Sequence, residues 1–104
     1  MNLNEMAGNA EHAAELLRAM ANKNRLMLLC LLNDGERSVT QLNAIIQIPQ
    51  SSLSQQLGVL RKEGLVNTRR DAQTIYYSLA SAEVRAIIQT LYNLYCAPEE
   101  IGQF

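Results

Sequence analysis

The sequence predicts one mainly α-helical domain, residues 1–104, that carries a small β-hairpin. The helical part is indicated by apolar residues that recur at a spacing of three and four through most of the chain. The hairpin is indicated by residues 65–69 and 74–79, which are rich in β-branched and aromatic side chains. A length of 104 residues is typical of a single domain.

Two helices are expected at the start of the chain. Residues 1–8 are expected to be frayed, and residues 9–21 carry small apolar side chains on one side and charged ones on the other, which predicts an amphipathic helix. Residues 25–32 are apolar almost all round, which is typical of a core helix buried by several partners. Gly35 supplies the turn that follows.

A short helix is expected over residues 39–47. Ser38 precedes it and is suited to cap its first turn. The side chains expected to face inward are Leu42, Ile45 and Ile46.

A second short helix follows at once. Pro49 suits its start and Gly64 its end. Its apolar stripe is formed by Leu53, Leu57 and Leu60. Two short helices in tandem over residues 38–63 predict a helix-turn-helix, and the hairpin over residues 65–79 then corresponds to the wing of a winged helix-turn-helix.

The outward face of the second helix is rich in hydroxyl and amide groups and has no carboxylate before Glu63. Such groups can hydrogen-bond base edges and phosphates in a DNA major groove. The candidate DNA-binding residues on this helix are Gln50, Ser51, Ser52, Ser54, Gln55, Gln56 and Lys62. A surface helix that is Ser/Gln-rich by chance is the alternative.

The hairpin adds further candidates for DNA contact. Arg69 and Arg70 are expected at its tip, with Gln73 beside them, where the two cations could meet phosphates or a minor groove. A solvated turn is the alternative for Arg70 alone. A helix-turn-helix followed directly by a basic hairpin favours DNA binding.

The last helix is expected over residues 81–96, with Ser81 as its cap. Its apolar face is broader than one small domain needs, so this helix and residues 9–21 are predicted to hold a homodimer. The tail that begins at Ala97 is expected to be disordered.

Charge and composition narrow the function. The net charge is −1, but residues 48–79 carry four basic against two acidic side chains, so the DNA-facing half is the positive one. No segment is apolar enough to span a bilayer, and the N-terminus has no signal-peptide pattern, so we expect a cytoplasmic protein without a membrane partner. The lone His12 cannot form a metal site. No cofactor and no catalytic residue is predicted.

Five segments carry a resemblance to a known family. The sequence resembles the ArsR/SmtB winged helix-turn-helix repressors over residues 11–96. The resemblance implies a dimer that binds a pseudo-palindromic double-stranded DNA operator. The matching phrases lie at residues 17–22, 25–26, 53–57, 60–66 and 71–79.

Within this family the metal-sensing pattern is missing. Residues 40–43 hold no thiol, and the last helix holds no His, so neither of the family's metal sites can be assembled. Cys30 and Cys96 instead resemble the cysteine pair of the BigR/SqrR/YgaV/HlyU branch, which senses reactive sulfur species or oxidants by linking those cysteines. The sequence departs from that branch in the DNA-reading element, where Gln56 replaces a usual His and Pro49 a usual Ser.

The resemblance predicts a transcriptional repressor that releases its operator when Cys30 and Cys96 are linked by a disulfide or by a persulfide- or polysulfide-derived bridge. We expect the two cysteines to lie close together within one subunit. Three alternatives stay open: an HlyU-like activator or anti-repressor of virulence genes, a small thiol oxidoreductase, and a winged-helix interaction module without DNA. For Cys30 alone, a small buried hydrophobic residue is the simpler interpretation.

Overall fold

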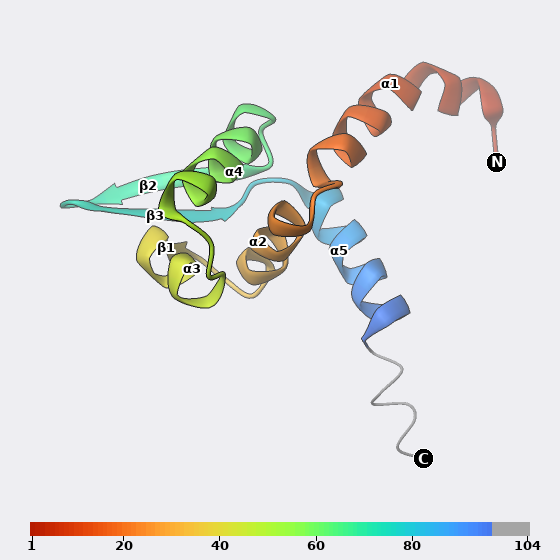
Figure 1. Ribbon diagram of the computed structural model, residues 1–104. Helices are drawn as coiled ribbons and strands as arrows, with labels where there is room; N and C mark the ends of the chain where they lie inside the picture. The colour runs from red at the N-terminus through yellow and green to blue at the C-terminus, as the bar shows by residue number, and fades with distance from the viewer. Residues whose placement is uncertain (97–104) are drawn as a thin grey trace, which may run out of the picture.

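Residues 1–96 form five helices and three short strands, shown from red to blue in Figure 1. The computed structural model describes these residues. The elements are α1 (Leu3–Met20), α2 (Lys23–Asn33), β1 (Arg37–Ser38), α3 (Val39–Ile45), α4 (Gln50–Lys62), β2 (Val66–Asp71), β3 (Thr74–Leu79) and α5 (Ala82–Tyr95). This is the predicted winged helix-turn-helix, and the predicted disordered tail lies outside the described residues.

The core lies where α2, α3 and α4 meet the sheet and the first half of α5. Leucines supply most of it, at the helical spacing that the sequence shows. The fully buried side chains are Leu28, Leu29, Leu32, Leu42, Leu53, Leu57, Leu60 and Val84. The predicted stripe of the second helix in the helix-turn-helix is therefore confirmed. The prediction that α2 is buried all round is wrong, because Met27 and Cys30 are exposed.

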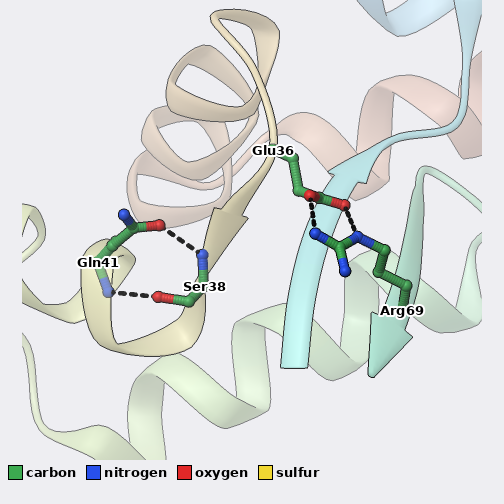
Figure 2. Close-up of polar contacts among 4 residues, drawn as sticks. All are labelled: Glu36, Ser38, Gln41 and Arg69. Atoms are coloured by element: carbon green, nitrogen blue, oxygen red, sulfur yellow. Dashed lines mark hydrogen bonds and ion pairs between the residues drawn. The ribbon is translucent and has the colours of Figure 1, made fainter. Parts of the chain in front are cut away.

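The first helix of the helix-turn-helix is held by a capping box. The Ser38 hydroxyl accepts a hydrogen bond from the Gln41 backbone N–H at 3.1 Å, and the Gln41 side chain accepts one from the Ser38 N–H at 2.8 Å (Figure 2). Two backbone donors are thus satisfied at the start of α3. Leu42 and Ile46 are buried as predicted, but Ile45 is 50% exposed, since α3 ends there after two turns.

The two ends of α4, the second helix of the helix-turn-helix, are stabilised in different ways. Pro49 is its N-cap and offers no side-chain hydrogen bond, so the start depends on the fixed backbone of proline. At the other end Gly64 has φ of 76°. The Gly64 N–H donates to the Arg61 carbonyl, and the Leu65 N–H donates to the Leu60 carbonyl. This is a Schellman motif, which needs the left-handed conformation that glycine adopts at little cost.

The wing is a three-stranded antiparallel sheet in the order β1-β3-β2. Val66 pairs with Leu79 and Asp71 with Thr74, so the turn consists of Ala72 and Gln73 alone. The sequence placed the turn at residues 70–73, and it missed β1, whose two residues pair with β3. A two-residue strand is too short to show the alternation by which strands are recognised.

The first helix is longer than predicted, whereas the last helix agrees with the prediction. The helix α1 begins at Leu3, not at residue 9, because the Asn2 side chain accepts hydrogen bonds from the N–H groups of Asn4 and Glu5. At α5, the Ser81 hydroxyl accepts a hydrogen bond from the Val84 N–H, which confirms the predicted cap.

The elements are spread out around this core. Figure 1 shows α1 projecting away from the rest of the chain and the wing pointing to the opposite side. The radius of gyration is 15.5 Å, against about 13 Å for a compact domain of 100 residues. Among the described helices, none has the length and apolarity to cross a membrane.

Candidate nucleic-acid interface

The outward face of α4 carries the predicted polar side chains. Gln50, Ser51, Ser54, Gln55 and Lys62 are exposed, whereas Ser52 and Gln56 are half-buried at the edges of that face. The exposed face thus offers two amides, two hydroxyls and one ammonium group.

A groove of about 520 Å³ separates α4 from the wing. The sequence prediction had included three of its lining residues, Gln50, Ser54 and Gln73. It had missed Thr40 in the first turn of α3, and Gly58 and Arg61 on α4. Arg61 follows Ser54 by seven residues, which is two helical turns, so the spacing could have identified it. The other lining residues are Val39, Leu57, Thr74, Ile75 and Tyr77.

The two arginines of the wing do not lie at its tip. Arg70 pairs with Ile75 and Arg69 pairs with Tyr76, and directly paired residues share one face of a sheet. Because Ile75 lines the groove and successive residues of a strand alternate, Arg70 belongs to the groove face and Arg69 to the opposite face. The tip is formed by Ala72 and Gln73.

Arg69 is held on that opposite face by a carboxylate. Its Nε and Nη2 donate to the two Glu36 oxygens at 2.8 and 2.7 Å, a bidentate pair drawn in Figure 2. The guanidinium also lies 4.4 Å from the centre of the Tyr76 ring. The hydrogen bond from Arg69 lowers the pKa of Glu36. Arg69 therefore joins the wing to the loop before β1 and does not face the groove.

Gln56 also has a partner within the chain. Its side-chain oxygen accepts a hydrogen bond from Arg25 Nη1 at 2.8 Å. The half-buried position of Gln56 at the edge of α4 follows from this contact with α2. Gln56, one of the predicted DNA-binding residues on α4, thus uses its side-chain oxygen in a hydrogen bond to α2.

The two cysteines lie on neighbouring helices. Cys30 belongs to α2 and Cys96 is the C-cap of α5, and both are exposed free thiols. The simple interpretation of Cys30 as a buried hydrophobic residue is therefore wrong. Arg85, in the first turn of α5, donates to the Asn33 side chain of α2 at 2.8 Å and so joins the two helices.

The Cys30 thiol has a distinct environment. Partial burial raises its pKa, and the negative charges of Cys96 and Asp34 raise that pKa further. Cys30 also opens into a hollow of about 280 Å³ between α2 and α5, which Met27, Ile88 and Tyr92 line.

The acidic, His and Cys side chains are scattered. Within residues 1–96, no three of them come together in a way that could hold a metal ion.

The chain is similar to known bacterial regulatory proteins. Residues 22–68 match the model of the bacterial regulatory protein, arsR family. The chain is 53% identical over 96 residues to the transcriptional activator HlyU of Vibrio cholerae, covering 92% of this chain and 89% of HlyU. It is 50% identical over 95 residues to the biofilm growth-associated repressor of Agrobacterium fabrum, covering 91% and 81%.

A solved structure agrees as well. The transcriptional repressor BigR from Xylella fastidiosa superposes with a TM-score of 0.88 at 43% identity, over 93% of this chain and 99% of BigR.

Proposed function

The chain belongs to the ArsR family of bacterial transcriptional regulators, which are not enzymes, and we propose that its α4 reads operator DNA as half of a homodimer. The observation that carries this proposal is the groove between α4 and the wing. Its α4 side presents hydroxyl, amide and guanidinium groups, and its wing side presents Gln73. These groups suit base edges and phosphates.

The contacts divide into two kinds. Ser51, Ser52 and Gln55 on α4 enter the major groove and read base edges. Arg61, Lys62 and Arg70 meet phosphates, which carry affinity but no sequence information. Arg69 is left out of this set, because its guanidinium is paired with Glu36 on the other face of the wing.

Repression is the first candidate for the regulatory outcome. Two of the similar proteins are repressors, from Agrobacterium fabrum and Xylella fastidiosa. The 53% identity to the activator HlyU favours activation or anti-repression as a second candidate. Both outcomes need only occupancy of DNA, so the position of the operator relative to the promoter distinguishes them.

The regulatory input that we propose is the thiol pair. The Cys96 thiolate attacks a sulfane sulfur of an inorganic polysulfide, and a shorter polysulfide leaves with the electron pair of the broken S–S bond. Cys96 then carries a persulfide. The Cys30 thiol loses its proton to water and attacks Cys96 Sγ, which expels hydrosulfide and forms a disulfide. The two thiols have lost two electrons, and the polysulfide has gained them.

The order of these steps follows from the environment of Cys30. Because its pKa is raised, less of it is present as the reactive thiolate at neutral pH. Cys30 therefore acts second, as the resolving thiol. A direct disulfide needs Cα atoms within about 7 Å of each other. At a wider separation, the Cys96 persulfide attacks a second polysulfide and gains one more sulfur, and a shorter polysulfide leaves with the electron pair of the broken S–S bond. The Cys30 thiolate then attacks the inner of the two added sulfurs, expels hydrosulfide and closes a bridge with one extra sulfur.

DNA binding is tested by footprinting on the DNA upstream of the protein's own gene, followed by titration at several salt concentrations. We expect one pseudo-palindromic site whose half-sites are separated by about one helical turn, roughly 10 bp, or a small multiple of it. Affinity should fall steeply with salt. Ser52→Ala and Gln55→Ala should relax sequence preference. A chain that gives no salt-dependent shift on any upstream fragment is an interaction module and not a DNA-binding regulator.

The thiol switch is tested by mass spectrometry of polysulfide-treated protein beside the same titration. We expect a cross-link between Cys30 and Cys96 and a loss of affinity of about 5- to 150-fold, which corresponds to a coupling free energy of about 1–3 kcal/mol. Peroxide in place of polysulfide shows whether the switch is selective. Cys30→Ser and Cys96→Ser are the controls. If both variants still respond to polysulfide as the wild type does, DNA binding stands and thiol control is refuted.

A further inference from the structure

Arg25 links three helices through one guanidinium group. Its Nε donates to the Ala19 carbonyl at 2.6 Å and its Nη2 to the Arg18 carbonyl at 3.4 Å, both in the last turn of α1. Its Nη1 donates to the Gln56 side chain on α4 at 2.8 Å. Arg25 itself lies in the first turn of α2. The end of α1 and the middle of α4 are therefore joined by one rigid, planar group.

The α1 side of this link is physically favourable. The last four carbonyls of a helix lack partners within it, and the end of the helix carries partial negative charge. A guanidinium satisfies both needs. The backbone of Arg25 is fixed too, because its N–H donates to the side chain of Asn22, the N-cap of α2, at 3.1 Å. The side chain thus starts from a defined point and has little freedom.

Close packing makes only part of this connection, because Ala19 and Met20 at the end of α1 are buried in the core but a hollow lies beside them. The space between the last turns of α1 and α4 is a hollow of about 240 Å³, lined by Glu15 and Arg18 on α1 and by Val59 and Glu63 on α4. A hollow transmits position poorly, because atoms across it do not touch. The hydrogen bonds of Arg25, which also lines it, are the connection that the structure places at this point.

We propose that Arg25 is a positioning residue that fixes the angle of α4 relative to α1 and thereby sets the half-site separation that the dimer accepts. This inference rests on the proposed function and on the sequence prediction that α1 lies in the interface of the homodimer. If α1 is held by the twofold axis, the placement of α4 relative to α1 determines the distance between the two recognition helices. Gln56 is then the residue of α4 that accepts the hydrogen bond from Arg25.

A base-reading Gln56 would behave differently. If Gln56 contacts DNA directly, its substitution changes the base preferred at one position and leaves the preferred separation unchanged. If Gln56 instead accepts the hydrogen bond from Arg25, its substitution changes the range of half-site separations that the protein binds. The base preference within each half-site then stays unchanged. The two roles therefore give opposite patterns in the same binding experiment.

The test measures affinity for a set of operators whose half-site separation is shortened or lengthened by one and by two base pairs. We expect the wild type to prefer one separation by about tenfold or more, and Arg25→Lys and Gln56→Leu to reduce that preference to about twofold. Lys keeps the charge but not the planar fork, and Leu keeps the size but not the acceptor. Gln56→Glu keeps an acceptor and should retain the preference.

The matched control is Gln55→Leu, the same substitution at the neighbouring position of α4, which should change base preference and keep the preferred separation. Thermal unfolding of each variant shows whether the substitution has only reduced the amount of folded protein. Such a loss would lower the apparent affinity for all operators by the same factor, whatever their half-site separation. If Arg25→Lys and Gln56→Leu both keep the wild-type preference, the inference is wrong although operator binding stands. If the wild type shows no preference for separation, the inference also fails.

Discussion

Arg69 and Arg70 are neighbours in β2, and the register of the strand assigns them to opposite faces of the wing. Arg69 is paired with Glu36, whereas Arg70 shares a face with Ile75 of the groove. Composition could not separate them, because both add one positive charge to the same strand. The alternation of side chains along a strand does separate them once the register is known.

Arg70→Ala should therefore weaken binding to all DNA sequences and lower the salt slope by about one unit. Arg69→Ala is the matched control, because it removes the same charge from the adjacent residue on the other face. It should change the slope by clearly less. Titration at several salt concentrations measures both variants, and an equal loss of slope in the two would contradict the division of the wing into two faces.

The Glu36–Arg69 pair gives the stability of the wing a dependence on pH. The pKa of Glu36 is lowered by its hydrogen bond to Arg69, so its contribution to stability is present above the ordinary pKa of glutamate and is lost as pH falls through the lower folded value. Glu36→Gln removes that dependence. The difference in Tm between wild type and variant should shrink as pH is lowered from about 6 to about 3. A difference that stays constant over this range would show that the pair does not contribute.

The ends of the helices could be predicted where a single residue caps or terminates the helix. Ser38 and Ser81 cap the helices that follow them, and Gly64 ends α4, because each acts on its own few neighbours. The Asn2 cap is equally local but was missed among exposed residues without apolar periodicity. The exposure of Ile45 and of Cys30 depends on which other elements pack against α3 and α2, and spacing within one helix does not contain that information.

In the wing and the candidate site, too, some features could be predicted from the sequence and others could not. The hairpin and the outward face of α4 could be predicted, since both follow from periodicity and residue type. The strand β1, the Arg25–Gln56 contact and the Glu36–Arg69 pair could not, because each joins residues more than thirty positions apart. Such contacts depend on tertiary packing.

At the scale of the element, Gly58 inside α4 and Gly64 just beyond its C-cap are two glycines whose substitution should have opposite effects on stability. Gly64→Ala forces a side chain into φ of 76° and should lower the free energy of unfolding by about 1 kcal/mol. Gly58→Ala, inside the helix, should raise it by roughly 0.5–1 kcal/mol. Apart from its chain neighbours and the nearby backbone of its own helix, no atom would lie within 4 Å of a Cβ added at Gly58. Denaturant unfolding measures both changes.

Gly58 lines the groove, so the stabilised variant has a second readout. If DNA approaches α4 closely there, Gly58→Ala should bind operator more weakly while being more stable. A variant that is more stable and binds equally well would show that the groove has room for a methyl group. The glycine would then have no explanation in the structure.

At the scale of the whole molecule, much apolar surface lies outside the core. On α1, Leu3 and Leu17 are 74% and 54% exposed, and on α5 Leu94 and Tyr95 are 64% and 78% exposed. The first ten residues are all exposed, so little within the chain supports the start of α1. An isolated helical segment of this length is marginal in water. These faces are the ones that a second copy of the chain would cover.

We therefore expect the protein to sediment as a dimer at micromolar concentration, and its helix content to fall when dilution produces monomer. Leu17→Glu and Leu94→Glu, which place charges on the two exposed faces, should shift the equilibrium toward monomer. Sedimentation velocity and circular dichroism over a dilution series measure the two quantities. A monomer at micromolar concentration with full helix content would contradict the assignment of α1 and α5 to an interface.

The pairing of β1 with β3 also has a consequence for the synthesis of the protein. Ser38 is paired with Tyr76, so the whole helix-turn-helix lies inside a loop whose ends are hydrogen-bonded to each other. Closing a long loop costs entropy, which the wing must recover through its own packing. During translation, α3 and α4 are synthesised before β3, and their final orientation waits for residue 79. A nascent chain thus holds both helices of the helix-turn-helix before it holds the strand that fixes how they are presented.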